Sequence, residues 1–262
     1  MVLSLMVQAE NINSQYRNKI LSFIKENIGK IDPTYKENLY PGDDSHKIPK
    51  PFTFSLILPD GFEAIKNGQD TIFKLKSPKD MFEIRISSSD YNFAQKLYDS
   101  LNHENAISFG DGVIGKIKNI FSYEYGPFNA SSLKIKFLSP ILLEQKGGRP
   151  LLSNKETKLE ESKFALFNSI LNEVENLKCK SLNGRVLNSP LELIPIDSKK
   201  RVVKHFVREF KAQTGKEMMY FTGLDGTFIL SGDSDDLNEL ALRGIGLRTG
   251  QGFGMFEVIE KI

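Results

Sequence analysis

The sequence predicts an α+β protein of two consecutive domains that share one order of elements: strand, helix, two strands, helix, strand. This order of apolar patterns occurs twice along the chain, although the residues themselves do not repeat. Residues 126–132, which are rich in Gly, Pro, Asn and Ser, separate the two occurrences. The length of 262 residues suits two domains of ordinary size. We therefore expect domains over residues 1–127 and 128–262.

The first domain is expected to begin with a buried strand over residues 2–7, where nearly all side chains are apolar. A helix should follow over residues 15–28, because apolar residues recur there at helical spacing and Gly29 ends the pattern. Residues 32–50 contain three prolines and two adjacent aspartates, which is typical of a loop. The remaining elements are strands over 52–58, 71–75, 81–86 and 113–125 and a helix over 90–103, with a turn at 77–80 that pairs strands 71–75 and 81–86.

The second domain repeats this order. Its expected elements are strands over 133–143, 186–194, 201–213, 217–231 and 252–259 and helices over 158–177 and 235–243. Apolar residues between 199 and 211 fit helical spacing better than alternation. We nevertheless prefer a strand, because the segment runs into a turn and a β-rich stretch and because of the family resemblance given below. Both domains then have the βαββαβ arrangement of the ferredoxin-like, or RRM-like, fold.

The composition is that of an ordinary soluble protein, with 40% hydrophobic and 26% charged residues. The net charge of +2 does not indicate a polyanionic partner, so an argument for nucleic acid depends on where the charges cluster. The one cysteine, Cys179, excludes an internal disulfide and is expected to be buried. No apolar run approaches the roughly 18 residues of a membrane span, so we expect a cytoplasmic protein without a membrane partner.

A glycine motif lies close to the C-terminus. Its two triplets, Gly-Ile-Gly and Gly-Phe-Gly, enclose one arginine, Arg248, and a further glycine. The candidate binding residues are Gly244, Gly246, Arg248, Gly250, Gly252 and Gly254. Glycine permits positive φ and close backbone approach, so such a loop can present N–H groups to phosphate oxygens. The alternative is a tight helix-to-strand connection without a ligand.

The position of this motif, after a short helix with an acidic start and before a final strand, resembles the RAMP superfamily. More narrowly, it resembles the CRISPR-associated pre-crRNA endoribonucleases, the sixth Cas family. Three further segments are similar to that family. They are residues 49–56, like its second strand with a lysine just ahead; residues 137–141, like the strand that opens its second domain; and residues 221–232, like the strand and turn before its last helix.

The resemblance implies an endoribonuclease that cuts CRISPR repeat RNA, converting pre-crRNA to crRNA. Members use the substrate's 2′-hydroxyl as nucleophile, leave 2′,3′-cyclic phosphate and 5′-hydroxyl ends, and need neither metal nor cofactor. Their usual catalytic set is a histidine near the first helix or in the loop before the second strand, often with a tyrosine and a lysine. The sequence leaves open whether the protein forms a homodimer or joins other Cas proteins in an interference complex.

His46 is the candidate for the catalytic histidine. It lies in a polar loop beside Lys47 and four residues before Lys50. Imidazole suits proton transfer near neutral pH, and the Lys50 ammonium would stabilise the negative charge of the transition state. Tyr35 and Tyr40 lie upstream, and the sequence does not choose between them as the residue that orients hydroxyl or phosphate. An exposed loop histidine without a function is the alternative for His46.

Residues 196–216 carry seven cations against two acidic residues. The cations are Lys199, Lys200, Arg201, Lys204, Arg208, Lys211 and Lys216. Such a segment can bind a phosphate backbone, and the resemblance favours RNA over its alternative, a solvated charged face. No His, Cys, Asp and Glu cluster has metal-ligand spacing, so no metal site is expected.

Two other functions compete with the nuclease. A catalytically inactive crRNA-binding subunit of the same superfamily would keep the glycine loop and basic segment while making His46 irrelevant. An unrelated ferredoxin-like enzyme would use the glycine loop to hold a phosphorylated metabolite, which the fold alone does not exclude.

Overall fold

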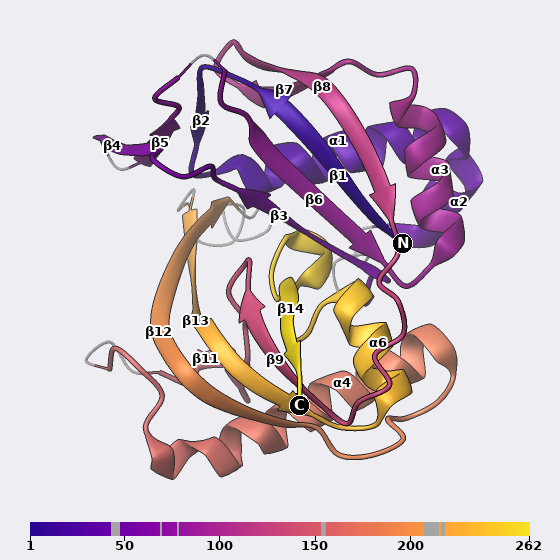
Figure 1. Cartoon of the computed structure of the whole chain (residues 1–262), viewed down its shortest axis with the longest axis vertical. Helices are drawn as coiled ribbons and strands as arrows, with labels where there is room; N and C mark the ends of the chain where they lie inside the picture. The colour runs from indigo at the N-terminus through magenta and orange to yellow at the C-terminus, as the bar shows by residue number, and fades with distance from the viewer. Residues whose placement is uncertain (43–47, 69, 78, 153–155, 207–214, 216–217) are drawn as a thin grey trace. The chain divides into compact units, whose positions relative to one another are not determined.

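The structure is a computed structural model of the chain, shown in Figure 1. It describes residues 1–262 except 43–47, 69, 78, 153–155, 207–214 and 216–217. The chain forms two compact units, and each draws on segments that are distant in sequence. Unit 1 comprises residues 1–47, 55–124 and 204–219, and unit 2 comprises residues 48–54, 125–203 and 220–262. The division at residues 127 and 128 stays a prediction about domains.

Unit 1 contains a sheet with the strand order β3-β6-β1-β8-β7. Its central strand, β1 (Val2–Gln8), runs antiparallel to β6 (Phe82–Ser88) and β8 (Val113–Tyr123). The edges are β7 (Ala106–Gly110) and β3 (Phe52–Ile57), whose first three residues are counted with unit 2. Helices α1 (Tyr16–Ile31) and α3 (Tyr91–Leu101) cover one face, as Figure 1 shows. The order of the strands apart from the added β7 is that of a ferredoxin-like domain.

Residues 33–39 form a helix that the sequence analysis missed. Helix α2 (Pro33–Leu39) begins at a capping residue, Asp32, whose side chain accepts a 2.8 Å hydrogen bond from the Tyr35 N–H. An aspartate cap followed by proline at the first helical position is a typical helix start. The prediction of a loop throughout residues 32–50 is therefore wrong over α2, because Pro33 begins an element there instead of breaking one.

The pairing expected between strands 71–75 and 81–86 is wrong. Strand β5 (Asp70–Lys74) pairs with β4 (Glu63–Asn67) and β2 (Asn11–Asn13) in a separate sheet of the order β2-β5-β4. Strand β6 joins β1 and β3 instead. All residues of β4 are exposed, so this strand carries no apolar pattern by which its sequence could be recognised.

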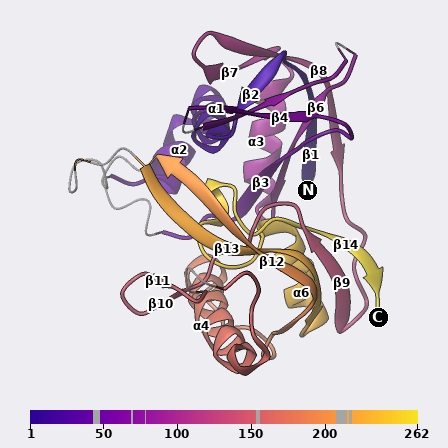
Figure 2. The same cartoon turned by 90° about the vertical axis from the view of Figure 1, so that its left-hand side faces the viewer.

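Unit 2 has the same architecture around a second sheet, of the order β12-β13-β9-β14. Its main elements are β9 (Ser132–Phe137), α4 (Phe164–Asn183), β12 (Glu192–Phe206), β13 (Met218–Ser231), α6 (Ser234–Arg243) and β14 (Phe256–Lys261). Strand β9 is antiparallel to both β13 and β14. Helices α4 and α6 lie on one side of the sheet (Figure 2). The prediction of two ferredoxin-like arrangements in an α+β protein is confirmed.

Short elements complete unit 2. They are the hairpin strands β10 (Glu144–Gln145) and β11 (Arg149–Pro150) and the 3-10 turns η2 (Glu161–Lys163) and η3 (Thr249–Gln251). Two expected strands, at 186–194 and 201–213, are one strand through Phe206, so the strand interpretation holds over residues 201–206. Residues 207–213, the rest of the expected strand, lie outside the described part of the chain. The last strand begins at Phe256, later than predicted, because the glycine motif occupies the residues before it.

The core of unit 2 is apolar and continuous beneath the sheet. Phe228 and Leu230 of β13 and Leu237 and Leu240 of α6 are fully buried in it. Cys179 belongs to the same cluster, which confirms the prediction that its thiol is buried. Among the helices that the structure describes, none is both long and apolar enough to cross a membrane.

Helix α4 is bonded to residues 187–193, which lead into β12, by asparagines at four-residue spacing: Asn168, Asn172 and Asn176. This spacing places the three side chains on one face of the helix. The amide of Asn172 accepts from the Leu191 N–H at 2.7 Å and donates to the Leu191 carbonyl at 2.8 Å. The other two asparagines accept bonds from backbone N–H groups on either side of Leu191. These bonds give partners to backbone groups ahead of β12 and at its start.

Replacing Asn172 by alanine should lower the free energy of unfolding by about 1–3 kcal/mol, because two backbone groups of Leu191 lose their partner. The exposed neighbour Ser169 provides a matched control on the same helix. We expect Ser169→Ala to leave stability within about 0.5 kcal/mol of the parent. Urea unfolding measures both variants, and equal stability for the two would contradict the bonding role of Asn172.

Candidate functional site

The glycine segment, residues 244–254, connects α6 to β14 within unit 2. Its two Gly-x-Gly triplets lie against each other, and the Ile245 N–H donates a 3.0 Å hydrogen bond to the Gly254 carbonyl. Gly254 has a φ of 66°, and a Cβ added there would stand 1.8 Å from the Ile245 oxygen. Only glycine permits this approach without a shift of the backbone.

Most glycine N–H groups of this segment are already used inside the protein. Gly244 donates to Leu240 O, Gly246 to Glu175 Oε1, Gly252 to Thr249 O and Gly254 to Pro140 O. The expectation that these amides are free to contact phosphate is therefore wrong for four of the five candidate glycines. Their conformations serve close packing within the protein, and RNA binding by the segment stays a prediction.

The first residues of β3 and the segment ahead of it pack along the glycine segment. A Cβ on Gly250 would stand 2.7 Å from Lys50 Cγ, so the lysine stem rests directly on the glycine backbone. The Thr53 hydroxyl donates a 3.0 Å hydrogen bond to the Phe253 carbonyl. Lys50 is only 7% exposed, and its ammonium donates to the Ile48 carbonyl at 2.9 Å. The structure thus brings a predicted catalytic residue, Lys50, onto the predicted glycine motif.

Arg248 has an unusual backbone conformation, with a φ of 59°. Left-handed φ is uncommon for residues other than glycine and marks strain that often occurs at functional sites. The guanidinium carbon lies 4.4 Å from the centroid of the buried Phe221 ring, and Nη1 lies 3.4 Å from Gln251 Oε1. Phe221 in turn packs edge-on against Phe253, with the ring centroids 5.7 Å apart. The arginine is therefore a half-buried cation held against an aromatic surface.

A buried ionic cluster, which we call the anchor cluster, holds the glycine segment from α4 and α6. It consists of Glu175, Lys178 and Arg243. The Glu175 carboxylate is fully buried and accepts bonds of 2.6 Å from both the Gly246 N–H and Arg243 Nη1. The Lys178 ammonium lies 3.2 Å from Glu175 and donates to the carbonyls of Gly246 at 3.0 Å and Gly244 at 3.4 Å.

Burial and neighbouring charges have opposite effects on the pKa values of Glu175 and Lys178 in the anchor cluster. Burial would raise the pKa of Glu175, but the charges of Lys178 and Arg243 hold it below its ordinary value. Burial lowers the pKa of Lys178 to about 8, against the opposing effect of Glu175. At neutral pH both groups are charged, so the cluster is a buried ion pair that also bonds the backbone.

The two candidate tyrosines belong to unit 1, whereas Lys50 belongs to unit 2. The Tyr35 hydroxyl donates a 2.6 Å hydrogen bond to Asp90, the residue that caps α3. Tyr40 follows α2, and the Lys25 ammonium lies 4.1 Å from its ring centroid. Burial raises the pKa of both tyrosines, and the bond to Asp90 raises that of Tyr35 further. Both hydroxyls therefore stay protonated at neutral pH.

Several predicted site residues lie outside the part of the chain that the structure describes. They are His46, Lys47, Arg208, Lys211 and Lys216. The assignment of His46 as the proton-transfer residue therefore stays a prediction.

The described part of the basic segment is less cationic than its sequence indicates. Arg201 pairs with Asp225 of β13 at 3.0 Å, and Lys204 pairs with Asp70 of β5 at 3.0 Å. Both acids lie far away in sequence, so counting charges along the segment missed them. Lys199 is exposed, and the backbone N–H of Lys200 donates to the Thr157 carbonyl at 2.6 Å.

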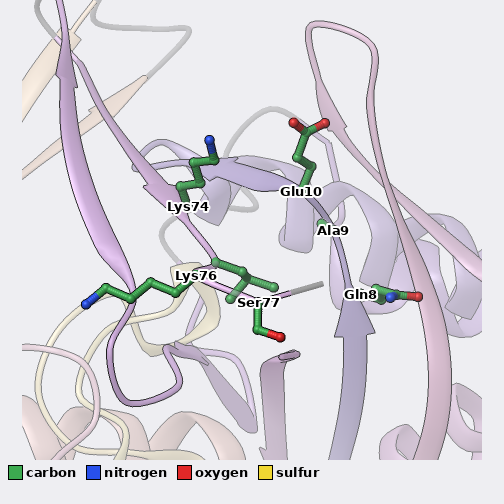
Figure 3. Close-up of a pocket in the computed structure, with 7 residues that line it drawn as sticks. Gln8, Ala9, Glu10, Lys74, Lys76 and Ser77 are labelled. Atoms are coloured by element: carbon green, nitrogen blue, oxygen red, sulfur yellow. The ribbon is translucent and has the colours of Figure 1, made fainter. Parts of the chain in front are cut away.

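A surface cavity of about 390 Å³ lies elsewhere in unit 1 (Figure 3). It is lined by Gln8, Ala9, Glu10, Lys74, Leu75, Lys76 and Ser77. Figure 3 shows the side chains of Lys74 and Lys76 pointing in different directions, so they do not converge on one anion. Within the described ranges, no group of three or more His, Cys, Asp and Glu residues is arranged to hold a metal ion.

The family model described as CRISPR associated protein Cas6, C-terminal, matches residues 122–258, more than half of the chain. The chain belongs to the Cas6 family. The resemblance inferred from the glycine motif is thereby confirmed, and the matched region contains the whole glycine segment and the anchor cluster. A comparison with curated protein sequences finds no match.

Solved structures share the fold over the whole chain. A Cas6-related protein from Pyrococcus furiosus has 20% identity and a TM-score of 0.78, covering 100% of this chain and 99% of the other. A RAMP protein described as binding different RNA substrates has 19% identity and a TM-score of 0.73, covering 99% and 100%. A CRISPR associated protein Cas6 has 20% identity and a TM-score of 0.69, covering 99% of both chains. At these identities the likeness establishes a common fold.

The sequence analysis missed the anchor cluster of this Cas6 family chain, although a signal for it exists. Glu175 occupies the apolar stripe of α4, four residues after the buried Leu171 and four before the buried Cys179. A charged residue at such a position has to be paired when the helix packs. Lys178, one turn further on, is at the spacing of a partner.

Two glycine substitutions separate the need for positive φ from the need for close approach. Gly184 has a φ of 70° with open space around it, so Gly184→Ala should cost about 1–2 kcal/mol for the left-handed conformation. Gly254→Ala should cost about 1–3 kcal/mol more, because its Cβ collides with the Ile245 carbonyl. Urea unfolding gives both values, and equal costs would show that the Gly254 contact relaxes freely.

Proposed function

We propose that this Cas6 family chain is an endoribonuclease that converts pre-crRNA to crRNA by cutting CRISPR repeat RNA without a metal ion. The observation that carries the proposal is the placement of Lys50, two residues ahead of β3, on the glycine segment of a Cas6 family chain. Family membership supports the substrate class. A solved structure of the same fold, with a TM-score of 0.59 and 15% identity, is described as a Cas6 product complex.

The proposed reaction is transesterification within the RNA. His46 accepts the proton of the 2′-hydroxyl, and the 2′-oxygen attacks phosphorus, forming the 2′-O–P bond as the P–O5′ bond breaks. The leaving 5′-oxygen takes a proton from water and His46 returns its proton to the solvent, which yields 2′,3′-cyclic phosphate and 5′-hydroxyl ends. Only P–O bonds form and break. No redox partner or co-reactant is needed.

Lys50 supplies the charge that this reaction needs at phosphorus. The two non-bridging oxygens of the scissile phosphate become more negative as the fifth bond to phosphorus forms. A fixed cation stabilises that charge. The lysine stem is held on Gly250 and the ammonium is directed by the Ile48 carbonyl. A cation in a site that largely excludes water acts more strongly than an exposed one. Tyr35 and Tyr40 are both kept as candidates for orienting the phosphate, and in this structure the Tyr35 hydroxyl donates its proton to Asp90.

RNA binding is proposed for the cations of the basic segment, for Lys47 and for Arg248. The Arg248 guanidinium is planar, so one face can rest on Phe221 while its N–H groups reach a phosphate. The candidate glycines contribute by shaping the segment that carries Arg248 and supports Lys50. This distribution makes binding depend on placed cations, since the whole chain is nearly neutral.

Replacing His46 by alanine should slow single-turnover cleavage of a cognate repeat by about 10²–10⁴-fold while the RNA Kd changes little, because the variant loses only a proton-transfer group. The exposed His103 gives a matched control, and His103→Ala should cleave at the parental rate. Cleavage by the parent protein should persist in EDTA and disappear when the nucleotide at the cut site carries a 2′-deoxy sugar.

The same assay decides between functions. Tight RNA binding without cleavage would favour an inactive crRNA-binding subunit, and absence of RNA binding would favour a metabolite enzyme. Cleavage of the 2′-deoxy substrate would overturn the proposed nucleophile.

Replacing Arg248 by alanine should weaken RNA binding more than it slows the cleavage step. If the arginine contacts one phosphate, the slope of log Kd against log salt should fall by about 0.7. Lys146, an exposed cation in the β10–β11 turn, provides a control for loss of one positive charge. Filter binding at several salt concentrations measures the slopes. Unchanged affinity with lost turnover would contradict a binding role for Arg248.

A further inference from the structure

We infer that Glu175 and Lys178 of α4 are positioning residues for RNA cleavage: they hold the glycine segment, and through it Lys50, in one arrangement. The inference rests on the proposed function for its activity readout. The hydrogen bonds of these two residues go to each other, to Arg243 and to the glycine segment, so we expect their effect on the reaction to pass through the glycine backbone.

The first link is the bond between Glu175 and Gly246. Its length is 2.6 Å, and its acceptor is an ionised carboxylate that is fully buried. Charge-assisted hydrogen bonds of this kind are about twice as strong as neutral ones. Because Gly246 has a φ of 86°, its backbone is in a conformation that other residues avoid, and the carboxylate secures it there.

The second link is Lys178, which is 6% exposed. Its ammonium donates to the carbonyls of both Gly246 and Gly244, at 3.0 and 3.4 Å. The N–H and the C=O of Gly246 are thus both bonded to side chains of α4, one turn of helix apart. This pair of bonds fixes the orientation of a peptide that has no side chain of its own to anchor it.

The third link carries this arrangement to Lys50. Ile245, between the two bonded glycines, donates its N–H to Gly254, and Leu247 donates its N–H to the Leu142 carbonyl. Gly250, in the turn between the triplets, supports the Lys50 stem at contact distance. A shift of the first triplet therefore moves the surface on which Lys50 rests.

Stability alone is a poor reason for burying these charges. Replacing a buried ion pair by apolar residues of similar volume is often neutral or stabilising, because the desolvation cost of the ions disappears. An apolar pair, however, cannot bond the N–H and carbonyl groups of Gly246. The chemistry of Glu175 and Lys178 therefore fits the fixing of a backbone better than the filling of a core.

The test is Glu175→Gln, which keeps the shape and removes the charge, with Glu173→Gln as the matched control. Glu173 lies on the same helix, two residues away, and is exposed. For folded protein at saturating repeat RNA, we expect Glu175→Gln to lower the single-turnover rate constant by about 10–100-fold, since small misplacements of a catalytic group cost that much. The RNA Kd should stay within about threefold, and Glu173→Gln should match the parent.

A double-mutant cycle with Lys50→Ala identifies the route of the effect. If Glu175 acts through Lys50, then Glu175→Gln should slow the Lys50→Ala variant by less than threefold, because the group being positioned is already gone. A full 10–100-fold loss in both backgrounds, or a rate for Glu175→Gln equal to that of Glu173→Gln, would overturn the positioning role while leaving the proposed nuclease intact.

Hydrogen exchange separates failure of this inference from failure of the proposed function. If the parent cleaves no repeat RNA, the nuclease proposal fails, and the positioning of the segment is read from the amides of residues 244–254. They should exchange at least tenfold faster in Glu175→Gln, or in Lys178→Met as a second variant, while those of β1 stay unchanged. If neither variant folds, hydrogen exchange of the parent protein tests the inference. The amides of residues 244–254 should then be as protected as those of residues 171–179 of α4. Rapid exchange of these amides would overturn the inference.

Discussion

The buried carboxylate of Glu175 is the interaction on which the arrangement of unit 2 around the glycine segment depends. An ionised group without contact to water is stable only when every strong acceptor position is matched by a donor. Here the donors are the Gly246 N–H, the Arg243 guanidinium and the Lys178 ammonium. Helix α4, helix α6 and the glycine segment therefore have to come together at one point, and a displacement of any one leaves a charge unpaired.

This constraint explains the glycine motif in physical terms. Four of its glycines have positive φ and use their N–H groups within the protein, so the motif is a device for close packing between α6 and β14. That packing positions two cations: Lys50, whose stem rests on Gly250, and Arg248, whose guanidinium lies over Phe221. In the proposed reaction, the glycines act by placing these two cations, one for charge at phosphorus and one for binding.

The charge of the basic segment follows from pairing with other strands more than from composition. Arg201 and Lys204 lie in a cationic run of sequence, yet each meets an aspartate from another strand. Partial neutralisation limits non-specific attraction of polyanions, since that attraction grows with the number of phosphates neutralised. A nearly neutral chain can still select RNA when a few cations are held in fixed positions.

The sequence by itself determined the fold class, the order of most elements, the burial of Cys179 and the family. Apolar periodicity indicates which residues face a core, and the spacing and position of the glycines gave the family resemblance that the family model confirms. Tertiary structure decided the rest. The pairing of β5 with β4, the amide donors of the glycines and the partners of Arg201 all involve residues distant in sequence, and a periodic pattern shows that a face is buried without showing what covers it. Glu175 shows this difference most clearly. Its place in an apolar stripe predicts that its carboxylate is paired, but only the folded chain shows that the partners are the Gly246 N–H and Arg243.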